Sequence, residues 1–370
     1  MTSALRGRPA FYRSYEQEMA LFNTRPKQVG VAAIVVVAAL MPWVLTDPLL
    51  QTMATAFVFA IGALGLNIVT GMAGQVSLGH AFFLGIGAYT AAAISGDPDD
   101  TVIGFGITFL PLWLLAGGVV AAIAGALVAP LATRLRGLYL AIVTLGLVFL
   151  GEHIFKEWQA LTGGQGVGRP AAEPVIFGYN FSTTSAFLTS EQNMYLLMFV
   201  LLLIFALFAR NLARSKVGRS FAAVRDRDVA AEMMGINLGR TKLLAFAISS
   251  FYAGCAGALL YTITGFMDPT SFNLLLSVQF IAMVLIGGAG TVAGTLMGAM
   301  FISLLPTITR ELPAYVPFIS TQVTVTPNVF QLESILYGLL IVGFLLFEPR
   351  GLFGIWIRIR NYWKSWPFSY

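Results

Sequence analysis

Residues Thr70 to His80 read TGMAGQVSLGH, and this stretch interrupts an apolar segment with three glycines, a glutamine, a serine and a histidine. Apolar residues continue on both sides, with FVFAIGALGL (57–66) before it and AFFLGIGAYTAAA (81–93) after it. In a bilayer, the backbone groups that a broken helix releases need protein partners or a water-filled cavity. The stretch therefore predicts a broken or re-entrant helix of a membrane protein.

The composition of the whole chain is that of an integral membrane protein. Of its 370 residues, 57% are hydrophobic and 11% are charged, and the mean hydropathy is +0.80. An ordinary soluble domain is about 45–50% apolar. Cys255 is the single cysteine, so the chain has no internal disulfide framework.

Long uncharged segments predict an all-α polytopic protein with about ten transmembrane helices and glycine-rich broken or re-entrant segments in both halves. A helix needs roughly 18 or more apolar residues to cross a bilayer. The fifth and the last of the predicted spans are marginal in length. The predicted spans cover residues 28–46, 49–69, 76–95, 108–132, 138–155, 194–209, 242–264, 273–288, 291–309 and 329–347. The membrane domain is thus expected over 28–347.

Positive charge gathers on one side of this ten-span topology. Arg and Lys cluster in an N-terminal tail (1–27), in a loop (210–242) and in a C-terminal tail (348–370). A long loop (156–193) and the segment SGDPDD (95–100) are acidic or nearly uncharged instead. Basic loops stay in the cytoplasm, so both termini and the 210–242 loop are predicted to be cytoplasmic and the 156–193 loop external. The net charge of +5 then reflects topology, and no nucleic-acid partner is expected.

The sequence lacks the patterns of an enzyme or a metalloprotein. No lysine follows a GxxxxGK[ST] loop, so the chain does not hold ATP in the P-loop manner. His153 and Glu157 share a helical i, i+4 spacing, but the other histidine, His80, is distant in sequence and two ligands make a weak metal site. We expect no catalytic residues, no metal and no cofactor in this chain.

A second glycine-rich break repeats the first. GMAGQV (71–76) and GGAGTV (287–292) both match G-x-A-G-x-V, and each lies between adjacent apolar spans. Interrupted helices at matching positions of two halves are the best sequence indication of a transporter's substrate path. Close packing of small residues explains the glycines equally well, and it is favoured for Gly294 and Gly298. The candidate path residues are Gly71, Gly74, Gln75, Ser77, His80, Gly287 and Gly290.

The side chain of His80 is ionisable and lies within a predicted span. Such a group is costly in a bilayer, so it is expected to face the interior of the helix bundle and to have a hydrogen-bond partner. A packing role and a role in lining the path both remain open for His80, Gln75 and Ser77.

The largest predicted cytoplasmic loop contains GRSFAAVRDRDVAAEMMGINLGRTK (218–242). Asp228 is placed to cap a short helix over 229–234 that Gly235 would close. This helix lacks an apolar stripe for lipid, and its mixed charges suggest a protein partner, although an ordinary basic loop remains the alternative. The candidate coupling residues are Arg219, Arg225, Asp226, Asp228, Glu232 and Gly235.

Several motifs, in this order, resemble the permeases of branched-chain amino acid type ABC importers, specifically the LivM-like subunit. They are GLNIVTGMAGQVSLGHAFFLGIGAYTAA (65–92), LRGLYLAIVTLG (135–146), LTGGQGVG (161–168), RDRDVAAEMMGIN (225–237), IAMVLIGGAGTVAGTLMGA (281–299) and YGLLIVGFLLFEPRGLFG (337–354). The resemblance covers roughly residues 64–354 and is weak before residue 50, over 170–192 and over 310–328.

The resemblance implies a subunit of a bacterial or archaeal plasma-membrane importer. Its implied partners are a second homologous permease subunit, two cytoplasmic ATPase subunits that bind ATP and Mg²⁺, an external solute-binding protein and the membrane lipid. Branched-chain or other apolar amino acids are the first expected substrates, and urea or short amides the second. A passive small-solute channel remains an alternative, whereas ion-coupled transport is disfavoured because every Asp and Glu lies near a span end or in a loop.

Overall fold

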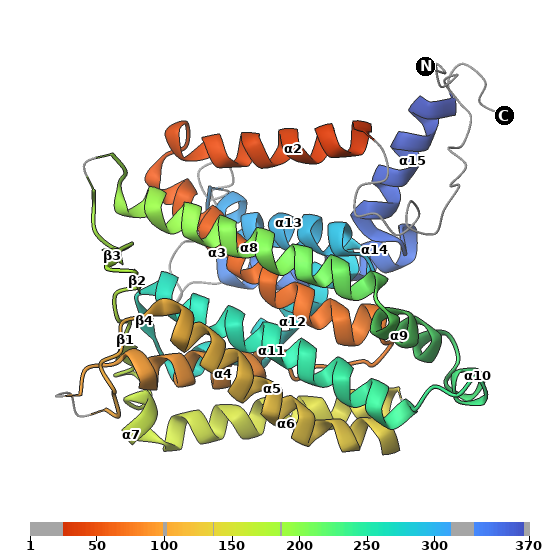
Figure 1. The fold of residues 1–370 in the computed structure, drawn as a ribbon, viewed down its shortest axis with the longest axis horizontal. Helices are drawn as coiled ribbons and strands as arrows, with labels where there is room; N and C mark the ends of the chain where they lie inside the picture. Colours follow the sequence, from red (N-terminus) through yellow and green to blue (C-terminus); the bar gives the residue numbers. More distant parts are fainter. Residues whose placement is uncertain (1–24, 99–101, 136, 186, 312–328, 366–370) are drawn as a thin grey trace.

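The computed structural model describes residues 25–98, 102–135, 137–185, 187–311 and 329–365. These residues form an all-α fold, as predicted from the apolar segments. The helices are α2 (Arg25–Leu40), α3 (Asp47–Leu66), α4 (His80–Ser95), α5 (Leu110–Arg134), α6 (Leu138–Glu157), α7 (Gln159–Thr162), α8 (Ser190–Arg214), α9 (Lys216–Asp226), α10 (Asp228–Met233), α11 (Leu238–Thr264), α12 (Leu274–Gly287), α13 (Val292–Glu311), α14 (Val329–Phe347) and α15 (Gly351–Ser365). Figure 1 shows the long helices running from one end of the molecule to the other.

Short strands and helical turns connect the helices of the described residues. The strand β1 (Arg169–Pro170) pairs antiparallel with β4 (Phe266–Met267), and β2 (Val175–Ile176) pairs with β3 (Tyr179–Asn180). Single helical turns are η1 (Met41–Trp43), the π-helical η2 (Asn67–Met72) and η3 (Pro269–Ser271). The strands lie at the opposite end of the molecule from α9 and α10 (Figure 1).

The predicted all-α polytopic fold is confirmed and each of the ten predicted spans contains a helix, but fewer than ten of these helices are long enough to cross a bilayer. Seven helical segments of the described residues are long and apolar enough to cross a membrane, or eight if α14 and α15 form one span bent by 45°. Both α2 and α4 have 16 residues, fewer than the about 20 that a bilayer needs. The helix α2 gives way to a 3₁₀ turn that contains Pro42, and α4 begins only at His80 because the preceding residues are not helical.

Within the segment predicted as the C-terminal tail, residues 351–365 form α15. This helix packs against α12 and α13. The basic residues that precede Arg25, together with residues 99–101 of the predicted external segment, lie outside the described residues.

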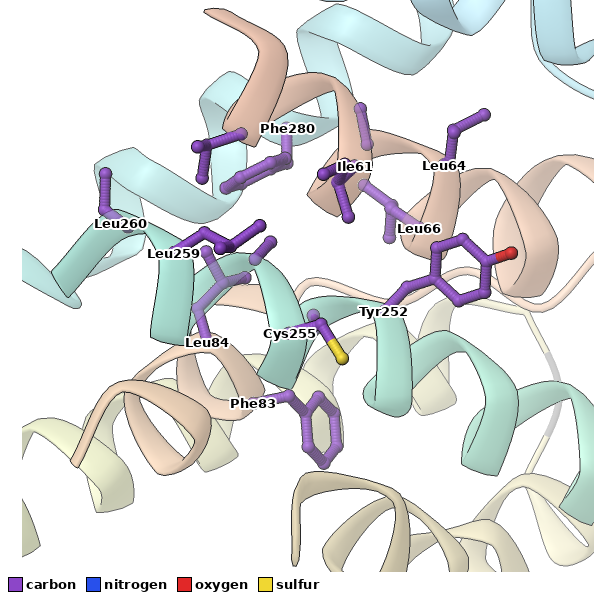
Figure 2. Close-up of a cluster of buried hydrophobic side chains, with 14 of the residues drawn as sticks. Ile61, Leu64, Leu66, Phe83, Leu84, Tyr252, Cys255, Leu259, Leu260 and Phe280 are labelled. Carbon is purple, nitrogen blue, oxygen red and sulfur yellow. The ribbon is translucent and has the colours of Figure 1, made fainter. Parts of the chain in front are cut away.

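The centre of the molecule is α11, which packs against α3, α4 and α5. Figure 2 shows how its side chains, among them Cys255 and Leu259, meet Ile61 of α3, Leu84 of α4 and Phe280 of α12. Small residues let the backbones approach closely, as is usual between membrane helices. A Cβ atom placed on Gly87 would lie 2.3 Å from the Cα atom of Gly254.

Candidate functional site: the two glycine-rich breaks and the 210–242 loop

The first glycine-rich break begins where α3 widens into the π-helical turn η2. The amide of Ala73 donates to the carbonyl of Ile68, five residues earlier, at 3.1 Å. Gly74 then adopts a positive φ of 68°, a conformation that glycine accepts without strain, and the chain stays non-helical until His80. Single π-helical turns inside α-helices are frequent at functional sites. The predicted break is therefore confirmed.

The second break separates α12 from α13. Gly288 and Gly290 have φ values of 115° and 84°. On either side of the break the helices pack closely, since a Cβ atom on Gly287 would lie 2.2 Å from the carbonyl oxygen of Gly294, and one on Gly298 would lie 2.0 Å from that of Met283. The packing role expected for Gly294 and Gly298 is confirmed, and Gly287 shares it.

The two breaks contact each other through Asn67, the first residue of η2. The Oδ1 atom of Asn67 accepts a hydrogen bond from the amide of Gly290 at 2.7 Å, and its Nδ2 atom donates to the carbonyl of Thr291 at 3.4 Å. Asn67 is fully buried. A Cβ atom on Gly71 would lie 2.4 Å from the amide nitrogen of Gly290. The repeated G-x-A-G-x-V pattern thus marks two segments that meet in space.

Arg225 of the 210–242 loop lies against both breaks at the point where they meet. Its Nη1 atom donates to the carbonyl oxygen of Gly71 at 3.2 Å. A Cβ atom on Gly74 would lie 2.7 Å from Cγ of Arg225, and one on Gly290 would lie 3.0 Å from Nη1. Four residues from three segments, namely Asn67, Gly71, Gly290 and Arg225, therefore form one cluster, which we call the break junction. The sequence predicted the path and the coupling loop as separate sites, and the structure brings them together.

The polar path candidates Gln75, Ser77 and His80 are buried and hydrogen-bonded. Gln75 donates from Nε2 to the carbonyl of Ala73 at 3.1 Å, and the hydroxyl oxygen of Ser77 accepts from the amide of Gly79 at 3.4 Å. His80 donates from Nε2 to the carbonyl of Gly62 in α3 at 2.8 Å. The expectation that His80 faces the interior with a partner is confirmed. Whether these side chains contact solute stays a prediction.

The short helix of the 210–242 loop lies close to its predicted position, but it is not capped as predicted. The helix α10 spans Asp228–Met233 where 229–234 was predicted, and Gly235 closes it with a φ of 82°. The predicted cap by Asp228 is wrong, because no side chain caps this helix. Asp228 instead lies 3.2 Å from Nζ of Lys242, whose side chain is buried. Asp228 is the first residue of the helix, with Arg227 at the cap position, and it supplies the paired charge that a buried cation requires.

Of the other coupling candidates, Asp226 and Glu232 are exposed, and Arg219 donates from Nη1 to the carbonyl of Arg214 at 3.2 Å. The sequence did not predict that three apolar side chains of this loop are also exposed: Val229 by 64%, Met233 by 85% and Met234 by 83%. We call these three residues the loop patch. An exposed apolar cluster on a segment outside the membrane spans marks an interaction site for a protein or a membrane surface.

At the end of the molecule opposite the loop helices, Asp268, which precedes η3, joins two segments of the chain by hydrogen bonds. Its carboxylate accepts hydrogen bonds from the amide of Gly166 at 2.8 Å and from the amide of Thr270 at 2.8 Å. Partial burial raises the pKa of Asp268, but these bonds and that from the Thr270 hydroxyl outweigh it, so the pKa is lower than usual. The ionised carboxylate thus ties the glycine-rich segment 163–168 to the connection between α11 and α12.

A cavity of about 210 Å³ also opens at this end, away from the break junction. It lies between α3, α8 and α11 and the segment before α8, and its polar lining includes Gln51, Ser182, Ser190, Glu191 and Thr262. Within the described part of the chain, no three His, Cys, Asp or Glu side chains lie close enough together to hold a metal ion.

Comparison with known proteins assigns this architecture to a family. The family described as branched-chain amino acid transport system, permease component, matches residues 49–345. The high-affinity branched-chain amino acid transport system permease protein LivM of Salmonella typhimurium is 30% identical over 347 residues, which cover 89% of this chain and 76% of that protein. LivM of Escherichia coli is 29% identical with the same coverage.

A second permease protein of Escherichia coli, LivH, is 23% identical over 304 residues, which cover 80% of this chain and 91% of LivH. No solved structure matches the chain. The family match spans both glycine-rich breaks and the whole 210–242 loop. The chain therefore belongs to the permease components of the branched-chain amino acid ABC transport systems, as a multi-pass subunit of the bacterial inner membrane that is not itself catalytic.

Proposed function

We propose that the chain is the translocation subunit of an ATP-driven importer for branched-chain or other apolar amino acids. In this proposal it pairs with a second homologous permease, receives solute from an external binding protein and is driven by two cytoplasmic ATPases. One observation carries the proposal. The loop that presents exposed methionines also holds, through Arg225, the break between α3 and α4. A docking surface and a candidate solute path are thus in direct contact.

The loop patch is the proposed seat of the ATPase. Methionine side chains are flexible and polarisable, and they adapt to a partner's apolar groove. The exposed charges of Arg227 and Glu232 form a polar rim beside them, as is common around the apolar centre of an interface. The ion pair between Asp228 and Lys242 fixes α10 to α11, so that the patch is presented on a rigid support.

Replacing both Met233 and Met234 with aspartate is expected to release the ATPases, because two charges would enter the apolar centre of the interface. Each such anchor typically contributes about 2 kcal/mol or more, so the affinity should fall by at least about 100-fold. Co-purification of tagged permease with its ATPases measures the effect. The matched control is Phe187→Asp, since Phe187 is 93% exposed within the 156–193 loop. Retention of the ATPases by the double variant would refute the proposed seat.

The candidate path residues Gly71, Gly74, Gln75, Ser77, His80, Gly287 and Gly290 are proposed to form the cytoplasmic end of the solute path. Gly71, Gly74 and Gly290 lie beside Arg225, near the loop helices, and not at the end that carries the strands. The candidate side chains themselves, Gln75, Ser77 and His80, are neutral and polar, and the charge of Arg225 is directed at the carbonyl of Gly71. Such a lining suits a zwitterionic solute, because a fixed charge at low dielectric would bind an opposite charge too tightly for release.

The proposed orientation places both termini and the 210–242 loop in the cytoplasm. In support, the first residues of α2 and the helix α15 lie at the same end as α9 and α10 (Figure 1). The membrane domain is then proposed over 28–347, with the 156–193 loop outside. The basic clusters that follow α5 and α8 obey the positive-inside rule in this orientation.

Single cysteines should report the orientation directly. Glu232→Cys is expected to react with an impermeant thiol reagent only after cells are permeabilised, and Phe187→Cys is expected to react in intact cells. Both original side chains are exposed, whereas the native Cys255 is buried and should stay silent. Labelling of Glu232→Cys in intact cells would show that the orientation is reversed.

The substrate assignment is tested by uptake into proteoliposomes. Leucine, isoleucine and valine should compete with one another for uptake that requires ATP, the binding protein and the ATPases. Competition by urea or short amides alone would favour the second substrate class. Uptake by the permease without ATPases would identify a passive channel.

A further inference from the structure

We propose that Arg225 and Asn67 are positioning residues for energy coupling: Asn67 holds the two glycine-rich breaks against each other, Arg225 ties the first of them to α9, and movement of α9 releases them. The inference rests on the proposed docking role of the loop that contains α9 and α10. It assigns to the break junction the closing of the cytoplasmic end of the path. The two residues act through the backbone of the breaks rather than by contact with solute.

The helix α9 is built to transmit a displacement. The hydroxyl oxygen of Ser215 caps it by accepting from the amide of Gly218 at 3.2 Å. Phe221 and Val224 are buried on its inner face, and the helix packs against α8, α11 and η2. Arg225 lies in its last turn, directly before α10. Only Arg227 separates α9 from α10, so a partner that displaces α10 would also displace Arg225.

The acceptor that Arg225 uses is the carbonyl of a residue at the end of a helix. Gly71 is the fifth residue of η2, which ends at Met72. Carbonyl groups in the last turn of a helix lack the donors that a following turn would supply. The guanidinium of Arg225 supplies one, and Asp226 orients it by accepting from Nε at 3.2 Å. Withdrawal of Arg225 would leave this carbonyl to seek another partner, which favours a different backbone conformation of the break.

Asn67 links the two breaks by both ends of its side-chain amide. The acceptor binds the amide of Gly290, the donor binds the carbonyl of Thr291, and the side chain is fully buried. A buried polar side chain that loses its partners is strongly disfavoured. The breaks therefore either stay together with Asn67 engaged, or separate so that Asn67 gives up both of its hydrogen bonds. This alternation is the behaviour that a gate requires.

The glycines make the junction possible. A Cβ atom on Gly71 would lie 2.0 Å from Oδ1 of Asn67, so a side chain there would displace the amide that joins the breaks. The positive φ values of Gly74 and Gly290 let each chain turn away immediately beside the contact. The glycine-rich pattern is thus explained by the junction as well as by the path.

The test compares Arg225→Gln with Arg240→Gln in the complete complex reconstituted in liposomes. Both changes remove one exposed basic group from the same 210–242 loop. The readouts are permease abundance, bound ATPase, and solute imported per ATP hydrolysed. We expect Arg225→Gln to lower the last ratio by about tenfold, because a hydrogen bond from a charged group is lost, with abundance and bound ATPase unchanged. Arg240→Gln should leave all three unchanged.

Two further variants keep the inference falsifiable. Arg225→Lys retains a charged donor and should recover at least about half of the ratio. Asn67→Asp retains the acceptor for Gly290 but loses the donor to Thr291, and it should lower the ratio as Arg225→Gln does. Equal coupling in Arg225→Gln and Arg240→Gln, or equal loss in Arg225→Gln and Arg225→Lys, would overturn the inference. Loss of bound ATPase in Arg225→Gln would also overturn it, by assigning Arg225 to the docking surface.

The docking proposal fails by a different observation, namely retained ATPase in the double methionine variant. In that case the Arg225 variants still show whether the breaks depend on the junction.

Discussion

Alanine in place of Gly71 is expected to abolish uptake, although it adds a single carbon atom. That carbon would lie 2.0 Å from Oδ1 of Asn67 and 2.4 Å from the amide nitrogen of Gly290. The second of these atoms belongs to the backbone, so a flexible side chain cannot relieve the overlap. The two breaks must separate, and the buried amide loses its partner at a cost of about 1–3 kcal/mol in addition to the overlap. Uptake normalised to permease abundance should fall by about 100-fold or more.

Gly146→Ala is the matched control for this experiment. Gly146 lies within α6, and no described heavy atom outside that helix lies within 4 Å of its added Cβ position. Its uptake should stay within about twofold of the native value, as for surface substitutions in general. Gly62 is less suitable, since an added Cβ atom would lie 2.6 Å from the ring of Phe280. Equal uptake by Gly71→Ala and Gly146→Ala would show that the breaks tolerate separation.

Leucine in place of Gly254 should prevent the chain from folding. At this position α4, α5 and α11 meet, and the added Cβ atom would lie 2.4 Å from the carbonyl oxygen of Gly117 and 2.5 Å from Cβ of Ala121. Even modest overpacking of a dense interior costs about 1–3 kcal/mol, and leucine adds four carbon atoms against backbone. Destabilisation should exceed about 3 kcal/mol, which is a large fraction of the stability of a typical protein.

Size-exclusion profiles and thermal unfolding in detergent measure this effect. Gly343→Leu serves for comparison, because Gly343 lies in α14 and its added Cβ position meets no described atom outside that helix within 4 Å. We expect a monodisperse protein for Gly343→Leu and aggregation or proteolysis for Gly254→Leu. A native unfolding temperature for Gly254→Leu would show that the three-helix contact is looser than its glycines indicate.

The fold could be predicted from hydropathy because every long apolar segment does become a helix. The length of each helix could not be predicted in this way, because a hydropathy average counts apolar residues whether or not their backbone is helical. Val76 and Leu78 count toward a predicted span over 76–95, yet they lie in the non-helical segment before α4. Likewise, the sequence placed the end of the first span at residue 46, but α2 ends at Leu40.

The candidate site was predicted in parts and not as a whole. Glycine spacing identified both breaks, and charge identified the loop, but their contact joins residues that are 154 and 223 positions apart in the chain. Periodicity carries no information about such pairs. One signal was present: Asn67 is a polar side chain in an apolar run, and such residues in a membrane need a partner. The cap assigned to Asp228 failed because the helix begins one residue earlier than predicted, so that Asp228 is its first residue and Arg227 stands at the cap position.

The separation between Asn67 and Gly290 also has a consequence for biogenesis. A ribosome adds about 5–20 residues per second, so the 223 positions between the two residues take roughly 10–45 seconds to synthesise. Throughout that interval α3 has been made while the backbone that will bind its asparagine has not. The nascent chain must therefore shelter a polar amide in the insertion machinery or in water until α13 emerges. A chain truncated before Gly290 would carry this unmet amide permanently, which gives membrane quality control a chemical mark by which to recognise it.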